Sequence, residues 1–257
     1  MRPNQCVVSA LTGLFLSVGS SSMADALLLA HYDMEDQNGS RLTDVSGNNR
    51  HANFGGGGHN YIVGGGADGS TSYNLTANGW QSIPAVTPAS GTLSLALWFR
   101  EPNTPRAGTE IIWGASNTQD PWFYVSNQAG NSRKLVVDLS ASSPQYLTSD
   151  NEVILDDTWH HLALVLDTNA DTVKGYVDGV LLIDRTTSNV SGSMRGHLGV
   201  TPGGALFNRA MFDDVRFYDG ELSAADVQRL ATFVPEPHTL TLLIGASIAL
   251  WGFRRRA

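Results

Sequence analysis

The sequence Asp157-Thr-Trp-His-His-Leu-Ala-Leu-Val165, with Gly175-Tyr-Val-Asp-Gly179 downstream, indicates the fold of this chain. Apolar residues occupy every second position from Leu162 to Leu166, as in a half-buried strand. The dipeptide Asp178-Gly179 favours a type I′ hairpin, because both central residues of that turn need a positive φ. These two stretches therefore predict neighbouring antiparallel strands.

Strand patterns recur along the rest of the chain. In Leu93-Ser-Leu-Ala-Leu-Trp-Phe99, the leucines and phenylalanine share one face, whereas Ser, Ala and Trp share the other. Shorter strands are expected within 110–114, 122–125 and 134–139. One short helix is expected after the capping box Ser223-Ala-Ala-Asp226. Many strands and one helix are typical of a β-sandwich or jelly roll.

Two glycine runs, Gly55–Gly58 and Gly64–Gly66, flank the apolar residues 61–63. Neither run is followed by the lysine and serine or threonine of a phosphate-binding loop, and no helical pattern follows them. We expect both runs to form flexible turns.

The N-terminus has the features of a secretory signal peptide. Residues 1–5 form a short basic n-region with Arg2, residues 6–18 form an apolar h-region, and Ser22 and Ala24 form a small-x-small cleavage pattern. A membrane helix is the alternative, but the apolar run is short and ends in serines. We expect residues 1–24 to be removed.

The C-terminal residues 234–257 combine a proline-flanked acid, an uncharged run and an arginine cluster. The prolines favour an extended linker. The run 239–253 can enter a bilayer, and the arginines would stay on the cytoplasmic side. This arrangement resembles the PEP-CTERM sorting signal of Gram-negative bacteria. The residues that match are Pro235, Glu236, Pro237, Arg254, Arg255 and Arg256.

The PEP-CTERM resemblance implies recognition by an exosortase-type processing enzyme, with cleavage near the Pro-Glu-Pro and transient anchoring in the inner membrane. A transmembrane helix that is never cut is the alternative. The uncharged run is shorter than the ~20 residues that cross hydrocarbon, which favours a processing signal.

Between these ends lies one domain, residues 25–233, which is long enough for a sizeable core. The ends hold four of the 16 basic and one of the 24 acidic residues, which leaves 12 and 23 and a net charge of −11. This charge argues against a nucleic-acid partner. The single cysteine, Cys6, lies in the signal peptide, so the mature chain has no disulfide.

Four segments of this domain resemble the laminin G-like, concanavalin A-like lectin/glucanase superfamily. The first is 29–35 with the turn Asp44-Val-Ser-Gly-Asn48, and the second is the tryptophan strand 95–99. The third is the tryptophan-histidine-histidine strand with its Asp-Gly hairpin, and the fourth is 212–218 with the capped helix. The resemblance covers roughly residues 27–232 and implies an all-β, two-sheet antiparallel jelly-roll sandwich whose chain ends lie close together.

Calcium is the cofactor that the resemblance suggests. Pairing of the first and last strands would bring acidic residues from both together, and carboxylate oxygens are good calcium ligands. Alternatively, Asp44 and Asn48 cap a turn through hydrogen bonds to the backbone, and Asp213 pairs with Arg216. The candidate ligands are Asp33, Glu35, Asp44, Asp213 and Asp214.

Glycoside hydrolysis is the enzymatic alternative on this fold, and it requires two carboxylates facing one groove. Asp33-Met34-Glu35 has the alternation but lies in the opening strand. Asp156-Asp157 and Asp213-Asp214 are adjacent pairs, which we expect to point to opposite faces. The same argument separates His160 from His161, which we expect to be structural. We assign no catalytic residue and do not expect an enzyme.

Aromatic side chains could stack on sugars. Trp122 follows Pro121 and is the best candidate for exposure, whereas Trp98 and Trp159 are expected in the core. The alternative is that the other aromatic residues are also core residues. The candidate stacking residues are Trp122, Tyr124, Trp113 and Trp80.

These patterns together predict an exported, non-catalytic protein of the cell envelope, the outer surface or the extracellular matrix. Its expected work is adhesion or binding of a protein or a glycan, such as an extracellular polysaccharide. Two other classes stay open, which are a carbohydrate-active glycoside hydrolase or lyase and a purely structural matrix component.

Overall fold

The computed structural model describes residues 26–101, 109–115, 121–126, 133–139, 146–150, 157–187, 190, 193–200 and 210–232. The predicted signal peptide, residues 1–24, and the predicted sorting signal, residues 234–257, lie outside the described residues. No helix of the described ranges is both long and apolar enough to cross a membrane.

The described residues form strands and one short helix, as the sequence predicts. The elements are β1 (Leu27–Tyr32), β2 (Arg41–Leu42), β3 (Ala52–Val63), β4 (Thr71–Ile83), β5 (Thr92–Arg100), β6 (Thr109–Ala115), β7 (Trp122–Ser126), β8 (Lys134–Asp138), β9 (Tyr146–Thr148), β10 (His160–Asp167), β11 (Thr172–Val177), β12 (Val180–Thr186), β13 (Gly196–Leu198), β14 (Met211–Asp219) and α1 (Ala224–Leu230).

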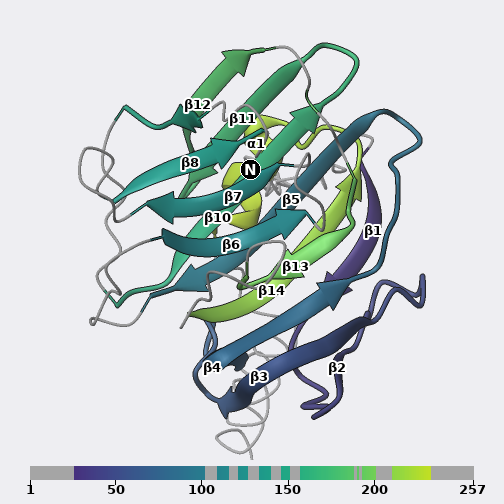
Figure 1. The fold of residues 1–257 in the computed structure, drawn as a ribbon, viewed down its shortest axis with the longest axis vertical. Helices are drawn as coiled ribbons and strands as arrows, with labels where there is room; N and C mark the ends of the chain where they lie inside the picture. Colours follow the sequence, from purple (N-terminus) through teal and green to yellow (C-terminus); the bar gives the residue numbers. More distant parts are fainter. Residues whose placement is uncertain are drawn as a thin grey trace, which may run out of the picture.

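The strands pair antiparallel in the order β12-β11-β10-β5-β14-β4-β13-β6-β7-β8-β9. β1 pairs with β14, and β3 lies outside β4 with β2 beside it. The sheet folds over on itself, so that β6, β7 and β8 cover β5, β10 and β14, and its two end strands β9 and β12 touch (Figure 1). This arrangement confirms the all-β antiparallel sandwich.

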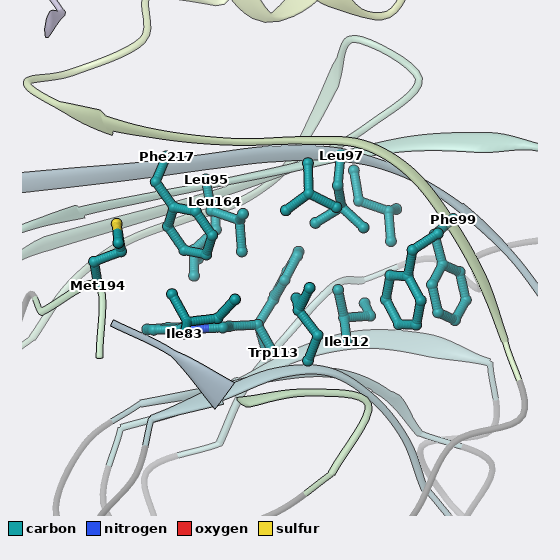
Figure 2. Packing of buried hydrophobic residues seen from close by; sticks show 14 of the residues in the cluster. Ile83, Leu95, Leu97, Phe99, Ile112, Trp113, Leu164, Met194 and Phe217 are labelled. Atoms are coloured by element: carbon teal, nitrogen blue, oxygen red, sulfur yellow. The ribbon is translucent and has the colours of Figure 1, made fainter. Parts of the chain in front are cut away.

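The main core lies between the two layers. Side chains of one layer, such as Leu95, Leu97 and Phe217, meet Ile112 and Trp113 of the other (Figure 2). All of these residues are at most 1 % exposed. Because this burial is the dominant favourable term in folding, it explains how a domain without disulfides is stable.

The hairpin and the helix both form where the sequence predicts them. Asp178 and Gly179 have φ values of 49° and 79°, as a type I′ turn requires. Ser223 and Asp226 make a capping box at the start of α1. The helix packs Val227 on a second apolar cluster with Ala163, on the side of β5 and β10 that faces away from the main core.

The first glycine run is not a flexible turn, and the prediction for Gly55–Gly58 is wrong. These residues belong to β3, which pairs with β4 through two register shifts. A Cβ atom on Gly55 would lie 2.2 Å from the ring of Trp80, and one on Gly57 would lie 2.0 Å from the carbonyl oxygen of Asn78. The glycines are therefore needed because neighbouring atoms occupy the space of a side chain.

Candidate functional site

A row of residues crosses five neighbouring strands on the outer face of the sheet. The register aligns His197 of β13 with Gly114 of β6, Gly114 with Trp122 of β7, Trp122 with Asp138 of β8, and Asp138 with Tyr146 of β9. We call these five residues the outer row. Their neighbours in the chain point into the main core, so the outer row faces away from it. Those neighbours are Leu198, Trp113, Phe123, Val137 and Leu147.

The outer row extends across this layer of the sheet. Four strand spacings separate its ends, which corresponds to about 19 Å. Tyr146 is 54 % exposed, and Trp122 and His197 are partly exposed. Asp138 of β8 lies between these two aromatic residues in the register and is largely buried. An aromatic face can stack on a sugar ring, and a carboxylate can accept hydrogen bonds from the hydroxyl groups of a sugar.

An apolar cluster supports Trp122 from the next row. Ile111, Tyr124 and Val136 lie side by side across β6, β7 and β8, and Trp122 packs against them. Burial raises the pKa of the Tyr124 hydroxyl, and the nearby Asp138 carboxylate adds to this effect. The phenol therefore stays neutral under ordinary conditions. This cluster thus supports Trp122, which lies at the centre of the outer row.

Trp80 extends the aromatic surface beyond β13. Its ring meets His197 edge to face, with 4.5 Å between the ring centroids. The same ring lies over Gly55, where it replaces the missing side chain and covers the backbone. Trp80 therefore has a structural task in addition to any contact with a ligand.

The structure separates the four predicted stacking residues. Trp122 and Trp80 are partly exposed on the outer face. Tyr124 shares this face but is only 8 % exposed. Trp113 is fully buried in the main core, so its prediction as a stacking residue is wrong (Figure 2). A register shift after Ile111 places Ile112 and Trp113 together on the core side.

The sequence prediction included only Trp122 of the outer row and missed its three other members with side chains, which are His197, Asp138 and Tyr146. Each lies on a different strand, and only the pairing register aligns them. Trp159, which was expected in the core, precedes β10, is partly exposed and donates a hydrogen bond to the carbonyl of Gly65 at 3.2 Å. The expected burial of Trp98 is confirmed.

The adjacent carboxylates of β14 do not point to opposite faces. Phe212 and Val215 both lie in the main core, so Asp213 and Asp214 between them are both outside it. A register shift against β5 and a φ of 48° at Asp214 mark this bulge. The prediction from strict alternation is therefore wrong at this position.

Asp213 and Asp214 bind different protein partners. Asp214 accepts hydrogen bonds from Arg216 at 2.8 and 2.9 Å, and its contact with His31 is 2.6 Å. Asp213 accepts hydrogen bonds from the backbone N–H of Ala67 at 2.9 Å and from the hydroxyl of Ser70 at 3.3 Å. The predicted Asp213–Arg216 pair is thus replaced by Asp214–Arg216.

The remaining predicted metal ligands also contact protein groups. Glu35 accepts a hydrogen bond from the backbone N–H of Thr71 at 2.7 Å, and Asp33 caps the N–H of Glu35 at 3.2 Å. Asp44 accepts the backbone N–H groups of His31, Ser46 and Arg50 at 2.8–3.0 Å. Asp44 is therefore a turn cap, as the alternative interpretation proposed.

The turn that Asp44 caps also covers the outer edge of β1. Asn48 donates to the carbonyls of Leu28 and Leu29 at 3.0 Å, and Arg50 donates to the carbonyl of Leu29 at 2.8 Å. Val45 donates its backbone N–H to the carbonyl of His31 at 2.8 Å. Backbone groups of this edge strand are thus satisfied by the turn.

Within the ranges that the structure describes, no three histidine, cysteine, aspartate or glutamate side chains come together as a metal site. The five candidate ligands therefore do not form one set. Calcium binding stays a prediction that rests on the family resemblance alone.

The two histidines of β10 lie in different surroundings, as expected. His161 is buried with its ring edge to face against Trp98, at 5.3 Å between centroids, and this burial lowers its pKa to about 4. His160 is partly exposed and lies 2.8 Å from Asp178. Asp178 also accepts the backbone N–H of His161 at 2.9 Å, which ties the hairpin to β10.

Residues 68–228, which are more than half of the chain, match the sequence profile of a laminin G family that is described as part of the concanavalin A-like lectin/glucanases superfamily. The chain belongs to the concanavalin A-like lectin/glucanase superfamily. A comparison with curated proteins finds no match.

The solved structures that resemble this chain belong to proteins with different functions. Domain 4 of the extracellular GH43 arabinanase AbnA from Geobacillus stearothermophilus, in complex with arabinotriose, has a TM-score of 0.63 and 24 % identity, over 80 % of this chain and 99 % of that domain. Botulinum neurotoxin type C, whose cell entry depends on two ganglioside molecules, has a TM-score of 0.57 and 13 % identity, over 80 % of this chain and 50 % of that one.

A third similar structure is Trypanosoma rangeli sialidase in complex with the inhibitor DANA. Its TM-score is 0.59 at 16 % identity, over 79 % of this chain and 32 % of the sialidase chain. This chain therefore spans about half of the neurotoxin chain and a third of the sialidase. At these identities the likeness establishes the superfamily fold, which enzymes and binding domains share.

The buried carboxyl group of Asp213 predicts that the stability of the folded protein depends on pH. Burial raises the pKa of its carboxyl group from 3.8 to about 7, and Asp214 and Asp68 contribute repulsion. A raised pKa means that its contribution to stability is full below pH 3.8 and is lost as the pH rises through about 7. We expect Asp213→Asn to flatten this loss in thermal unfolding between pH 5 and 8. Parallel pH profiles of the two proteins would contradict this assignment.

Proposed function

We propose that the protein is a non-catalytic carbohydrate-binding protein and that its ligand lies along the outer row. The observation that carries this proposal is the alignment of Trp122, Asp138 and Tyr146 on three neighbouring strands. The two aromatic residues can supply apolar faces to a sugar ring, and the largely buried Asp138 lies between them on β8. Such a surface suits an extended oligosaccharide better than a compact small molecule, because it is long and spread over several strands.

Binding is favoured over hydrolysis by the chemistry of the same face. Glycoside hydrolysis needs two carboxyl groups across the scissile bond. Among the described strand residues of the outer row, Asp138 supplies one carboxylate, and its neighbours are aromatic or glycine. The other acidic cluster, Asp213 and Asp214, lies on β14 and is engaged with backbone, arginine and histidine groups.

The similar structures and the charge of the chain support a glycan as the ligand. The similar arabinanase domain is in complex with arabinotriose, and the similar neurotoxin interacts with gangliosides. We carry only the ligand class over to this chain. The net charge of −8 disfavours polyanions such as nucleic acids, so we propose a neutral glycan, such as an extracellular polysaccharide.

The binding proposal predicts that Trp122→Ala and Tyr146→Ala each weaken glycan binding by about 2- to 12-fold, because one aromatic contact is worth about 0.5–1.5 kcal/mol. The probe is an array of neutral and acidic oligosaccharides that includes arabinotriose and ganglioside glycans. The best hit is then titrated by calorimetry against each variant.

The matched control is Trp159→Ala, which removes a partly exposed tryptophan that lies outside the outer row, beside β10. We expect it to leave the affinity unchanged while circular dichroism shows that each variant is folded. Equal losses in all three variants would contradict the outer row as the site. A complete lack of glycan binding would instead favour a structural matrix component.

We also propose that the protein is exported and processed at its C-terminus by an exosortase, which would place it at the cell surface or in the matrix. The support is the sequence of residues 234–257 alone. Mass spectrometry of the native protein is expected to find its C-terminus near Val234–Pro237. Recovery of an intact Arg256-Ala257 on the surface protein would leave the uncut membrane anchor.

A further inference from the structure

The edges of the sheet are protected against further pairing at three places. The turn 44–50 covers β1 through Asn48 and Arg50. The end strand β9 has three residues in the part of the chain that the structure describes. The end strand β12 carries the exposed charged residues Asp184 and Arg185. Short strands, covering loops and charges are the usual means by which proteins prevent edge-to-edge association.

Beyond Phe54, the outer edge of β3 lacks these protections within the described residues. Its only described strand partner there is β2, which pairs with Ala52 and Asn53, and Phe54 adds one hydrogen bond to Ser40 at 3.2 Å. Beyond Phe54, no strand of the described residues pairs with this edge. The whole strand, Ala52–Val63, contains no lysine, arginine, aspartate or glutamate.

The second half of β3 has the geometry for further pairing. The two register shifts with β4 occur before Gly58, and from Gly58 to Val63 every residue pairs in sequence with β4. A bulge would twist the edge away from a partner, so this regular stretch is the available one. Its exposed side chains are Asn60 and Val63, which is 73 % exposed.

We propose that Gly58–Val63 pairs antiparallel with the same segment of a second copy of this chain. An antiparallel strand pair of identical segments has twofold symmetry, so each copy offers the same surface and the assembly closes as a dimer. Charge argues for this edge as the contact. The chain carries a net charge of −8, so two copies repel, and an edge strand without charged residues is where they can approach most easily.

This dimer would join the β3 strands of two copies into one continuous sheet. The outer row lies on β13, β6, β7, β8 and β9, on the other side of β4 from β3. The contact therefore leaves both glycan surfaces free, and it does not depend on the proposed function. If both hold, the dimer presents two binding surfaces, which raises avidity for a repetitive polysaccharide.

Sedimentation velocity of the purified protein over a range of concentrations tests the proposal. The edge variant is Asn60→Glu with Val63→Glu, which adds two negative charges to the segment. The matched control is Val180→Glu with Leu181→Glu, which adds the same charge at two exposed positions of β12. We expect the edge variant to weaken dimerisation by about tenfold or more, and the control to change it little.

Hydrogen exchange provides the second measurement. In the original protein, backbone amides of residues 58–63 are expected to gain protection as the concentration rises, and those of β12 are not. A protein that stays monomeric at all concentrations would overturn the proposal and leave a strand of a different protein as the occupant. Equal weakening by both variants would also overturn it, because the contact would then lie elsewhere.

Discussion

Replacing Trp113 by alanine is expected to lower the free energy of unfolding by about 3–5 kcal/mol, which is the usual range for a buried tryptophan. Trp113 is fully buried, and its ring lies against Phe217 of the opposite layer at 6.3 Å between centroids (Figure 2). Its removal would leave a large cavity between the layers. Chemical denaturation monitored by circular dichroism measures this loss.

Two variants test whether the loss comes from the cavity. Trp113→Phe keeps most of the ring volume, and the indole N–H of Trp113 has no hydrogen-bond partner among the described residues, so this variant should lose much less stability. Trp122→Ala removes a partly exposed ring from the outer face and should also be milder. If Trp113→Ala were as stable as Trp122→Ala, the core position of Trp113 would be wrong.

Replacing Gly57 by alanine is expected to destabilise the protein by about 2–5 kcal/mol, because a left-handed backbone and an overpacked contact are combined. Gly57 has a φ of 72°, and its new Cβ would lie 2.0 Å from the carbonyl oxygen and 2.1 Å from the carbonyl carbon of Asn78. Both of these atoms belong to the backbone of β4. The clash could be relieved only by moving one strand away from the other.

The control for Gly57 is Gly39→Ala. A Cβ on Gly39 would have no atom within 4 Å, so this variant should change stability by less than about 0.5 kcal/mol. Thermal unfolding of both variants under identical conditions measures the difference. Similar melting temperatures for the two variants would show that β3 and β4 do not approach as closely at Gly57 as described.

The regular parts of the fold follow from local sequence patterns. Alternation places Leu95, Leu97 and Phe99 in the main core, and it places Ala96 in the cluster beneath α1. The Asp178-Gly179 turn also forms as predicted, because it depends on backbone preferences of adjacent residues. Each of these features is decided within a few residues, which a single sequence can show.

The bulges could not be predicted, and they account for two of the wrong assignments. One extra residue in β6 turns Trp113 into the core, and one in β14 places Asp213 and Asp214 together outside it. Alternation fails at a bulge because the side-chain period of a strand is interrupted there. The partner strand determines where this happens, and the sequence of one strand does not contain that information.

The outer row shows the same limit for the candidate site. Trp122 could be proposed from the sequence because it is an aromatic residue beside a proline. Asp138 and Tyr146 join it only through the register of β7, β8 and β9. The glycine run of β3 was misread for a related reason, because its need for glycine arises from Trp80 and Asn78 of the neighbouring strand.

The pairing of β1 with β14 determines how the domain would respond to mechanical force. Leu27, at the start of β1, lies opposite Asp219, at the end of β14. Tension applied between these two residues would load the strand pair from one end, so its hydrogen bonds would break one after another like a zipper. Pulling along the strands would instead load all of them together. A domain pulled between these two ends would thus yield first at β1, and the main core would then lose Leu29, Ala30 and Tyr32.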